Sequence, residues 1–191
     1  TKRKAGALGW HATNQNNQFI MNLDAQIESD GNMEYKVVLI ARKDGEINDI
    51  ALRTELAPNI AQYMMGLGEK GGYCPQNLDW KWDVEKNQDA LWTGSVNGGL
   101  QLRFYDDKYE RPLNTNFYHE KPLHMPVSWC NNGNGGIKLS AAGKNTLINA
   151  YSGKRTVKKG DRLCFYFNVL ITPFRTINPD KQWQDRYYHG Y

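Results

Sequence analysis

The chain has few cysteines and no long hydrophobic run. Its three cysteines, Cys74, Cys130 and Cys164, are an odd number, which excludes a framework in which every cysteine is paired. None of them lies in a Cys-x-x-Cys motif or at metal-ligand spacing from a histidine, so no zinc site is predicted. The longest apolar run, Leu163 to Thr172, is interrupted by Asn168 and is shorter than the roughly 20 residues that span a membrane. It predicts a buried strand instead.

Recognisable motifs for catalysis or cofactor binding are also missing. The glycine-rich segment from Gly66 to Gly72 lacks the Lys-Ser/Thr ending of a phosphate-binding loop, and no helix pattern follows it. The four histidines follow no nucleophile motif, and no serine lies in a Gly-x-Ser-x-Gly elbow. The net charge is only +4, with the basic residues in short clusters, so a nucleic-acid-binding stripe is not predicted. We therefore expect no cofactor, no metal, no catalytic residue and no nucleic-acid partner.

What the sequence has in abundance is apolar residues that alternate with polar ones, the period of a β-strand. Between residues 19 and 27 every second residue is apolar, and the turn Asp30-Gly31-Asn32 leads to a second run at 35–41. A third run, 50–56, follows the turn Asp44-Gly45, so these three strands are predicted to form a meander. Residues 59–67 fit either one face of a helix or a strand at 63–65 that runs into Gly66, and we favour the strand. Further strands are predicted at 90–96, 100–104, 137–141, 147–151 and 163–171.

This succession of strands predicts an all-β fold, an antiparallel two-sheet β-sandwich. Residues 163–171 are apolar on both faces and are expected at the centre of a sheet. Asn178-Pro179-Asp180 combines a capping residue, a proline suited to the first helical position and an acid at the positive end of the helix dipole. It predicts a short C-terminal helical tail. We divide the chain into a β-sandwich domain at 1–176 and a linker or tail at 177–191.

Aromatic residues make up 12% of the chain, and two groups of them are candidates for function. Trp80 and Trp82 project to the same side of an extended segment and are flanked by Asp79 and Asp83. That arrangement suits stacking on sugar rings while the acids accept hydrogen bonds from sugar hydroxyls, and Trp129 is a further candidate. The competing interpretation, which we favour, is that these tryptophans pack in the core or against a neighbouring domain.

The second group is the C-terminal aromatic segment. Exposed aromatic residues at the end of a free domain need a surface to pack against. Because the chain starts at Thr1, with no initiator methionine or signal sequence, and ends on this segment, we expect it to be one module of a longer protein. The candidates for interdomain packing are Trp183, Arg186, Tyr187, Tyr188 and Tyr191.

An ordered series of segments carries a family resemblance. It consists of Tyr63-Met64-Met65-Gly66-Leu67-Gly68, Trp80-Lys81-Trp82-Asp83, residues 100–113 with Arg111-Pro112-Leu113, residues 126–129, residues 159–174 with Thr172-Pro173-Phe174, and Arg186-Tyr187-Tyr188-His189-Gly190 in the tail. The series covers roughly residues 15–191. In this order the segments resemble the N-terminal β-sandwich domain of glycoside hydrolase family 123-type proteins.

The resemblance implies a large, mutarotase-like super-sandwich that precedes a (β/α)₈ barrel in the same polypeptide. In that family the barrel carries the acidic catalytic residues and acts on glycans that contain N-acetylgalactosamine, with help from the substrate's acetamido group. None of those catalytic residues falls in this chain, so this chain alone is not expected to be an enzyme. By the same resemblance, the parent protein is expected to be a glycoside hydrolase that is secreted, periplasmic or attached to the cell surface.

The leading hypothesis is therefore a non-catalytic domain that packs against the catalytic barrel and supports it. The alternatives are a carbohydrate-binding module with an aromatic platform, an enzyme in its own right, and a general interaction or adhesion module. Paired carboxylates would be needed for the enzymatic alternative. Its candidates are Asp79, Asp83, Glu85 and Asp106-Asp107, which turns and solvated strand faces also explain.

Overall fold

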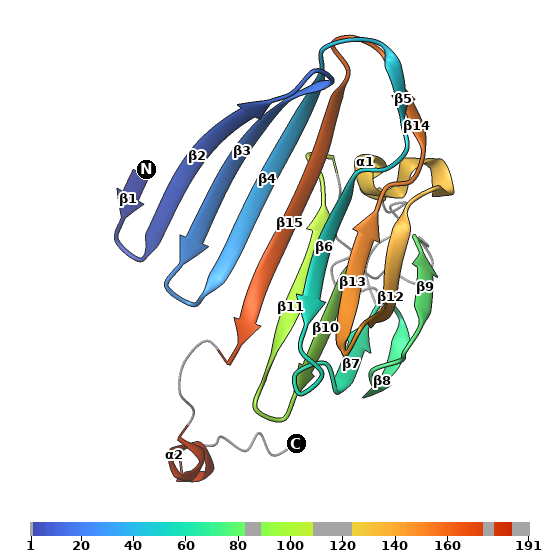
Figure 1. Ribbon diagram of the computed structural model, residues 1–191. Helices are drawn as coiled ribbons and strands as arrows, with labels where there is room; N and C mark the ends of the chain where they lie inside the picture. The colour runs from blue at the N-terminus through green and yellow to red at the C-terminus, as the bar shows by residue number, and fades with distance from the viewer. Residues whose placement is uncertain (1, 83–88, 109–123, 174–177, 185–191) are drawn as a thin grey trace.

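Two antiparallel sheets of unequal width form the protein in the computed structural model, which describes residues 2–82, 89–108, 124–173 and 178–184 (Figure 1). The described strands of the large sheet are, in spatial order, β1 (Lys2–Lys4), β2 (Ala7–Gln15), β3 (Phe19–Glu28), β4 (Asn32–Ala41), β15 (Arg162–Thr172), β11 (Gly98–Tyr105), β10 (Ala90–Ser95), β7 (Tyr63–Gly66) and β8 (Glu69–Tyr73). Those of the small sheet are β6 (Ala51–Leu56), β13 (Asn145–Tyr151), β12 (Gly136–Ala142) and β9 (Leu78–Lys81). A separate ribbon pairs β14 (Arg155–Val157) with β5 (Gly45–Ile47).

The helices of the described chain are short. α1 (Val127–Cys130) runs into a 3₁₀ turn at Asn131–Gly133, which leads to β12. α2 (Pro179–Gln184) begins where the sequence predicts a helix. Its cap is formed by Asn178, whose side-chain oxygen accepts a hydrogen bond from the backbone N–H of Lys181 at 3.1 Å. The short helical tail is thus confirmed up to residue 184.

The antiparallel sandwich predicted from the sequence is confirmed, and β15 is the fifth of the nine described strands, at the centre of the large sheet. The predicted three-stranded meander is wrong. β3 and β4 form its hairpin, but β6 pairs with β13 in the small sheet. The intervening β5 pairs with β14, so the chain leaves the large sheet before β6 begins. Alternation in a sequence shows which face of a strand is buried, but it does not determine which other strand pairs with it.

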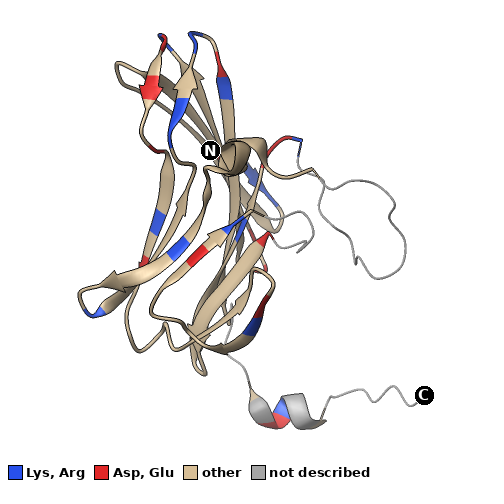
Figure 2. Cartoon of the chain, turned by 90° about the vertical axis from the view of Figure 1, so that its right-hand side faces the viewer, with Lys and Arg blue, Asp and Glu red and all other residues tan. Residues whose placement is uncertain are grey.

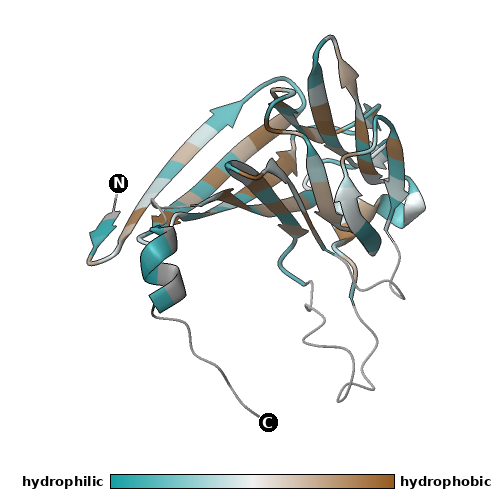
Figure 3. Ribbon diagram, turned by 90° about the horizontal axis from the view of Figure 1, so that it is seen from below, coloured by the Kyte–Doolittle hydropathy of each residue, from teal (hydrophilic) through white to brown (hydrophobic). Residues whose placement is uncertain are grey.

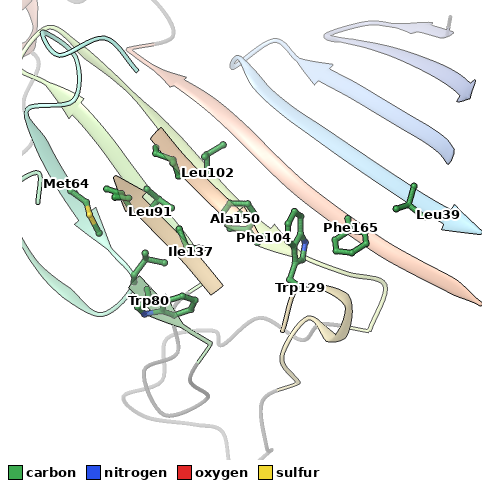
Figure 4. Close-up of a cluster of buried hydrophobic side chains, with 13 residues drawn as sticks. Leu39, Met64, Trp80, Leu91, Leu102, Phe104, Trp129, Ile137, Ala150 and Phe165 are labelled. Atoms are coloured by element: carbon green, nitrogen blue, oxygen red, sulfur yellow. The ribbon is translucent and has the colours of Figure 1, made fainter. Parts of the chain in front are cut away.

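The core lies between the small sheet and the central strands of the large sheet (Figure 4). Phe104 on β11 is fully buried and meets the indole of Trp129 edge-on, with 5.1 Å between ring centroids. Trp129 in turn meets Phe165 on β15 in the same geometry at 4.9 Å. Edge-to-face pairs of this kind add to the stabilisation from burial. The remaining fully buried side chains come from both sheets and include Leu91, Leu102, Ile137, Leu139 and Ile148.

The small sheet is too narrow to cover the inner face of the large one. Of the large sheet's left-hand strands in Figure 1, β4 contributes Leu39 to the buried core, whereas none of the described residues of β2 belongs to it. β3 contributes only Phe19 and Met21, which pack at the rim of the core. The strands β1 to β4 therefore extend beyond the small sheet, and both of their faces are available for function.

Candidate functional site

The tryptophans predicted to form a sugar platform lie in or beside the core. Trp80 is 4% exposed and Trp129 is 2% exposed. Trp82 is partly buried and meets Trp80 edge-on at 4.9 Å. The indole N–H of Trp129 donates to the backbone carbonyl of Tyr166 at 3.1 Å. In this arrangement the rings of Trp80 and Trp129 are buried among other core side chains.

Asp79 lies on the outer face of the small sheet in a polar cluster. The Tyr151 hydroxyl donates to Asp79 Oδ1 at 2.9 Å and accepts a hydrogen bond from Lys81 Nζ at 2.6 Å. Lys138 Nζ lies 3.4 Å from Asp79 Oδ2. Burial opposes ionisation of Asp79, but the Tyr151 hydrogen bond and the two lysines outweigh it and lower the pKa of the carboxyl group. Burial and the neighbouring carboxylate raise the pKa of Tyr151 to about 12.

Of the other candidates, Asp106 is buried and accepts a hydrogen bond from the backbone N–H of Lys108 at 2.9 Å, and Asp107 is paired with Arg162 at 2.7 Å. The remaining ones fall outside the described part of the chain: Asp83, Glu85, the side chain of Trp183, and the tail residues Arg186, Tyr187, Tyr188 and Tyr191. Their roles in sugar contact or interdomain packing stay predictions. Two further surfaces lie on the large sheet. No local sequence pattern predicts them, because each is assembled from several strands.

The first surface is the inner face of β2, β3 and β4 beyond the small sheet. An aromatic row crosses it: Trp10 meets Tyr35 edge-on at 6.0 Å, and Tyr35 stacks on Phe167 at 4.9 Å. Ala25 lies between Trp10 and Tyr35 in the strand register, and its small side chain lets the two rings meet. Figure 3 shows hydrophobic residues on the strands that extend beyond the small sheet. We call this surface the open apolar face; it comprises Leu8, Trp10, Leu23, Ile27, Met33 and Tyr35.

The open apolar face is only partly covered by the described chain. Leu8 is 37% exposed, and Ile171, on the same side of β15, is 57% exposed. The other members are half-buried, mainly by one another along the strands. A continuous run of apolar side chains in this condition is typical of a surface that meets another protein surface.

The second surface is the opposite, polar face of the same strands, which carries a hollow of about 570 Å³. Its polar lining consists of Lys4, His11, Asp24, Gln26, Glu34 and Lys36, and Ala7, Gly9, Trp10 and Ala25 complete it. The residues lie in adjacent rows of the sheet, because Gly9 is opposite Gln26 and Gln26 is opposite Glu34. We call this feature the polar hollow.

Hydrogen bonds hold the carboxylates of the polar hollow in place. Glu34 Oε1 accepts the Tyr105 hydroxyl at 2.5 Å, and Glu34 Oε2 is 3.0 Å from Lys36 Nζ. Asp24 Oδ1 is 2.9 Å from Nδ1 of His11, whose other ring nitrogen is 3.1 Å from the Thr13 hydroxyl. Burial, the hydrogen bond to Glu34 and its charge raise the pKa of Tyr105, so the phenol is the proton donor at neutral pH.

An exposed pair of tyrosines lies at the far end of the large sheet. Tyr63 on β7 stacks on Tyr73 of β8 at 5.4 Å, and Tyr73 is 84% exposed. The stacked pair leaves an aromatic ring open to solvent. Among the described residues, Tyr73 is the aromatic side chain with the largest exposed fraction.

Nothing in the described residues forms a metal centre or a disulfide. No group of three or more His, Cys, Asp or Glu side chains among them is arranged to hold a metal ion. Cys74, Cys130 and Cys164 are free thiols, and Cys164 is a buried side chain, as expected from its apolar strand.

No helix in the described ranges has the length and apolar character needed to cross a membrane. Acidic and basic residues are interspersed on the strands seen in Figure 2.

Comparison with known families defines the class of protein to which this sandwich belongs. A family model matches residues 1–173, which include every described strand of the sandwich, and identifies it as a domain of a carbohydrate-active protein. The model is that of glycoside hydrolase 123, third domain, and the chain belongs to this family. The family description places the domain third, whereas the resemblance implied an N-terminal position. No curated protein matches the sequence of this chain.

Three solved structures match this chain at low sequence identity. The Slr1438 protein from Synechocystis sp. PCC 6803 matches 89% of this chain and 63% of its own, with a TM-score of 0.46 and 8% identity. A presumed aldose 1-epimerase from Escherichia coli K12 matches 90% of this chain and 67% of its own, with a TM-score of 0.43 and 7% identity. A presumed kojibiose phosphorylase from the human microbiome has a TM-score of 0.34 and 14% identity. That match covers 94% of this chain but only 19% of the phosphorylase.

Proposed function

We propose that this chain is a non-catalytic supporting domain of a glycoside hydrolase. It packs against a catalytic (β/α)₈ barrel of the same polypeptide, and the barrel acts on glycans that contain N-acetylgalactosamine. Membership of the glycoside hydrolase 123 family supports the parent activity. The observation that carries the supporting role is the open apolar face, a run of hydrophobic side chains that the small sheet leaves uncovered.

Burial of this face supplies the energy for domain packing. Complete burial of one large aliphatic or aromatic side chain is worth about 1.5–3 kcal/mol relative to full exposure. The six side chains of the open apolar face are half-buried already, so each has only part of that value left to gain. Together they suffice for a stable contact between domains that are tied in one chain, because tethering removes most of the entropic cost of association.

The test is an apolar-to-charged substitution made both in the isolated chain and in the full-length parent. Leu8→Asp changes a side chain that is 37% exposed, so the isolated chain should lose little stability. In the parent, the buried charge should separate the unfolding of the sandwich from that of the barrel and lower turnover of a chromogenic N-acetylgalactosaminide. Gln15→Asp, an exposed position on the same strand and the opposite face, is the matched control.

Equal effects of Leu8→Asp in the isolated chain and in the parent would contradict the proposal, since the face would then be free in both. Deletion of the domain provides a second readout. A barrel that keeps its full thermal stability and activity without residues 1–191 needs no support from them.

A further inference from the structure

The polar hollow is independent of the open apolar face, although both involve the same strands. Side chains alternate between the two faces of a sheet, so Gly9 and Glu34 lie on one face while Leu8 and Tyr35 lie on the other. A domain packed against the apolar face therefore leaves the polar face accessible. A function of the hollow does not rest on the supporting role proposed above.

The hollow is a product of residue size in the strand register. Gly9 occupies the middle of its floor and has no side chain, and Ala7, two residues away on the same face, is nearly as small. The neighbouring positions on β3 and β4 carry long polar side chains, Gln26 and Glu34. Short residues bordered by long ones leave a depression of about 570 Å³, within the size range of roughly 300–1,000 Å³ found for small-molecule sites.

The lining offers hydrogen-bond donors and acceptors in nearly equal measure. Asp24 and Glu34 are acceptors, Lys4 and Lys36 are donors, and the Gln26 amide is both. An anionic ligand would face two carboxylates, and a cationic ligand would face two ammonium groups. A neutral ligand is repelled by neither set of charges. If it carries many hydroxyl groups, it can bond to both sets, because each hydroxyl both donates and accepts a hydrogen bond.

The fixed carboxylates strengthen this assignment. Glu34 is held by Tyr105 and Lys36, so it is oriented before a ligand arrives and loses little freedom on binding. Each carboxylate oxygen has more than one lone pair, and those of Glu34 Oε2 and Asp24 Oδ2 remain able to accept ligand hydroxyls. The small apolar side chain of Ala7, on the same face as Gly9, gives the C–H face of a ring a surface to contact.

We propose that the polar hollow is a binding site for one neutral sugar unit of a glycan. Its role rests on the parent activity proposed above: it would hold part of a glycan away from the catalytic barrel and raise the local concentration of substrate. Its ligand contacts would come from carboxylates and an amide around Gly9, instead of from the buried tryptophans.

The experiment is a titration of the chain followed by the chemical shifts of its backbone amides. The probes are methyl β-N-acetylgalactosaminide, methyl β-galactoside and sodium phosphate at millimolar concentrations. At least one sugar should shift the amides of Gly9, Asp24 and Gln26, and phosphate should not. Shifts confined to the Tyr63–Tyr73 pair, no shift with either sugar, or stronger binding of phosphate would each overturn the proposal.

Substitutions separate the site from the general stability of the fold. Gly9→Val fills the floor with a residue that suits a strand, removes no polar group and should abolish binding. Asp24→Asn and Glu34→Gln should each weaken binding by roughly tenfold or more, as expected for loss of a charged acceptor. Glu46→Gln, on the β5–β14 ribbon, is the matched acid-to-amide control and should bind as the wild type does. Wild-type binding by Gly9→Val in a folded protein would overturn the proposal.

Discussion

Tyr105 on β11 donates its phenolic proton to Glu34 Oε1 on β4 at 2.5 Å, although β15 lies between these two strands. The bond therefore spans three strands at the centre of the large sheet. The Tyr105 ring also meets Tyr166 of the intervening strand edge-on, at 5.7 Å. One wall of the polar hollow is thus tied to the most central strands of the fold.

We predict that Tyr105→Phe destabilises the domain by about 1.5–3 kcal/mol, because a partly buried carboxylate loses a hydrogen-bond donor. Urea denaturation of the isolated chain measures the loss. Tyr73→Phe, which removes the same hydroxyl from a ring that is 84% exposed, should change stability by less than about 0.5 kcal/mol. Equal stabilities for the two variants would show that the Glu34 bond makes no net contribution.

The raised pKa values of Tyr105 and Tyr151 predict a loss of stability in alkali. The pKa of Tyr151 is about 12 in the folded protein, raised by burial and by Asp79, against about 10 for an unperturbed tyrosine. The folded state therefore keeps a proton that the unfolded state releases. Stability from this source is complete below about pH 10 and falls as the pH rises toward about 12.

Denaturant midpoints measured across that pH range check the prediction. Tyr151→Phe should make the decline with pH less steep, and the double variant with Tyr105→Phe should make it less steep still. A decline in the double variant as steep as in the wild type would contradict the assignment to these two phenols.

Much of the fold was predictable from local alternation, and the sites were not. The period of two in residues 19–27 and the two apolar faces of 163–171 identify β3 and the central β15. The same local pattern could not reveal that β6 pairs with β13, since a partner is chosen by long-range packing. The polar hollow depends on Gly9 lying opposite Gln26, a register that no single segment encodes. β2 went unpredicted because residues from His11 to Gln15 are exposed and lack the alternation of a half-buried strand.

The buried position of Trp129 predicts a structural role. Its ring packs between Phe104 and Phe165, so Trp129→Ala should leave a cavity and cost about 3–5 kcal/mol of folding free energy. Urea denaturation measures this loss, and Tyr73→Ala at an exposed ring is the control. If Trp129→Ala kept wild-type stability but reduced binding of a methyl glycoside, the sugar-platform interpretation would be favoured over packing.

A tryptophan lying across two glycines gives the sharpest test of packing on the large sheet. The indole N–H of Trp92 donates to the Thr172 hydroxyl at 2.8 Å. The indole ring lies over Gly94 and Gly99, which pair with each other on β10 and β11. A Cβ atom added at Gly99 would lie 2.5 Å from Cζ2 of Trp92, closer than two non-bonded carbon atoms approach in proteins.

Gly99→Ala must therefore displace the indole and break its hydrogen bond to Thr172. Overpacking of this kind costs about 1–3 kcal/mol, and the released ring should change its fluorescence. Gly72→Ala is the matched control, because a Cβ there would meet nothing within 4 Å. In the Trp92→Leu background only part of the cost of Gly99→Ala should disappear, because the added Cβ would also lie 2.8 Å from the Cα of Gly94. A double-mutant cycle measures the part that belongs to the indole. An unchanged cost in that background would place the strain in the backbone of β11 instead of in the contact with the indole.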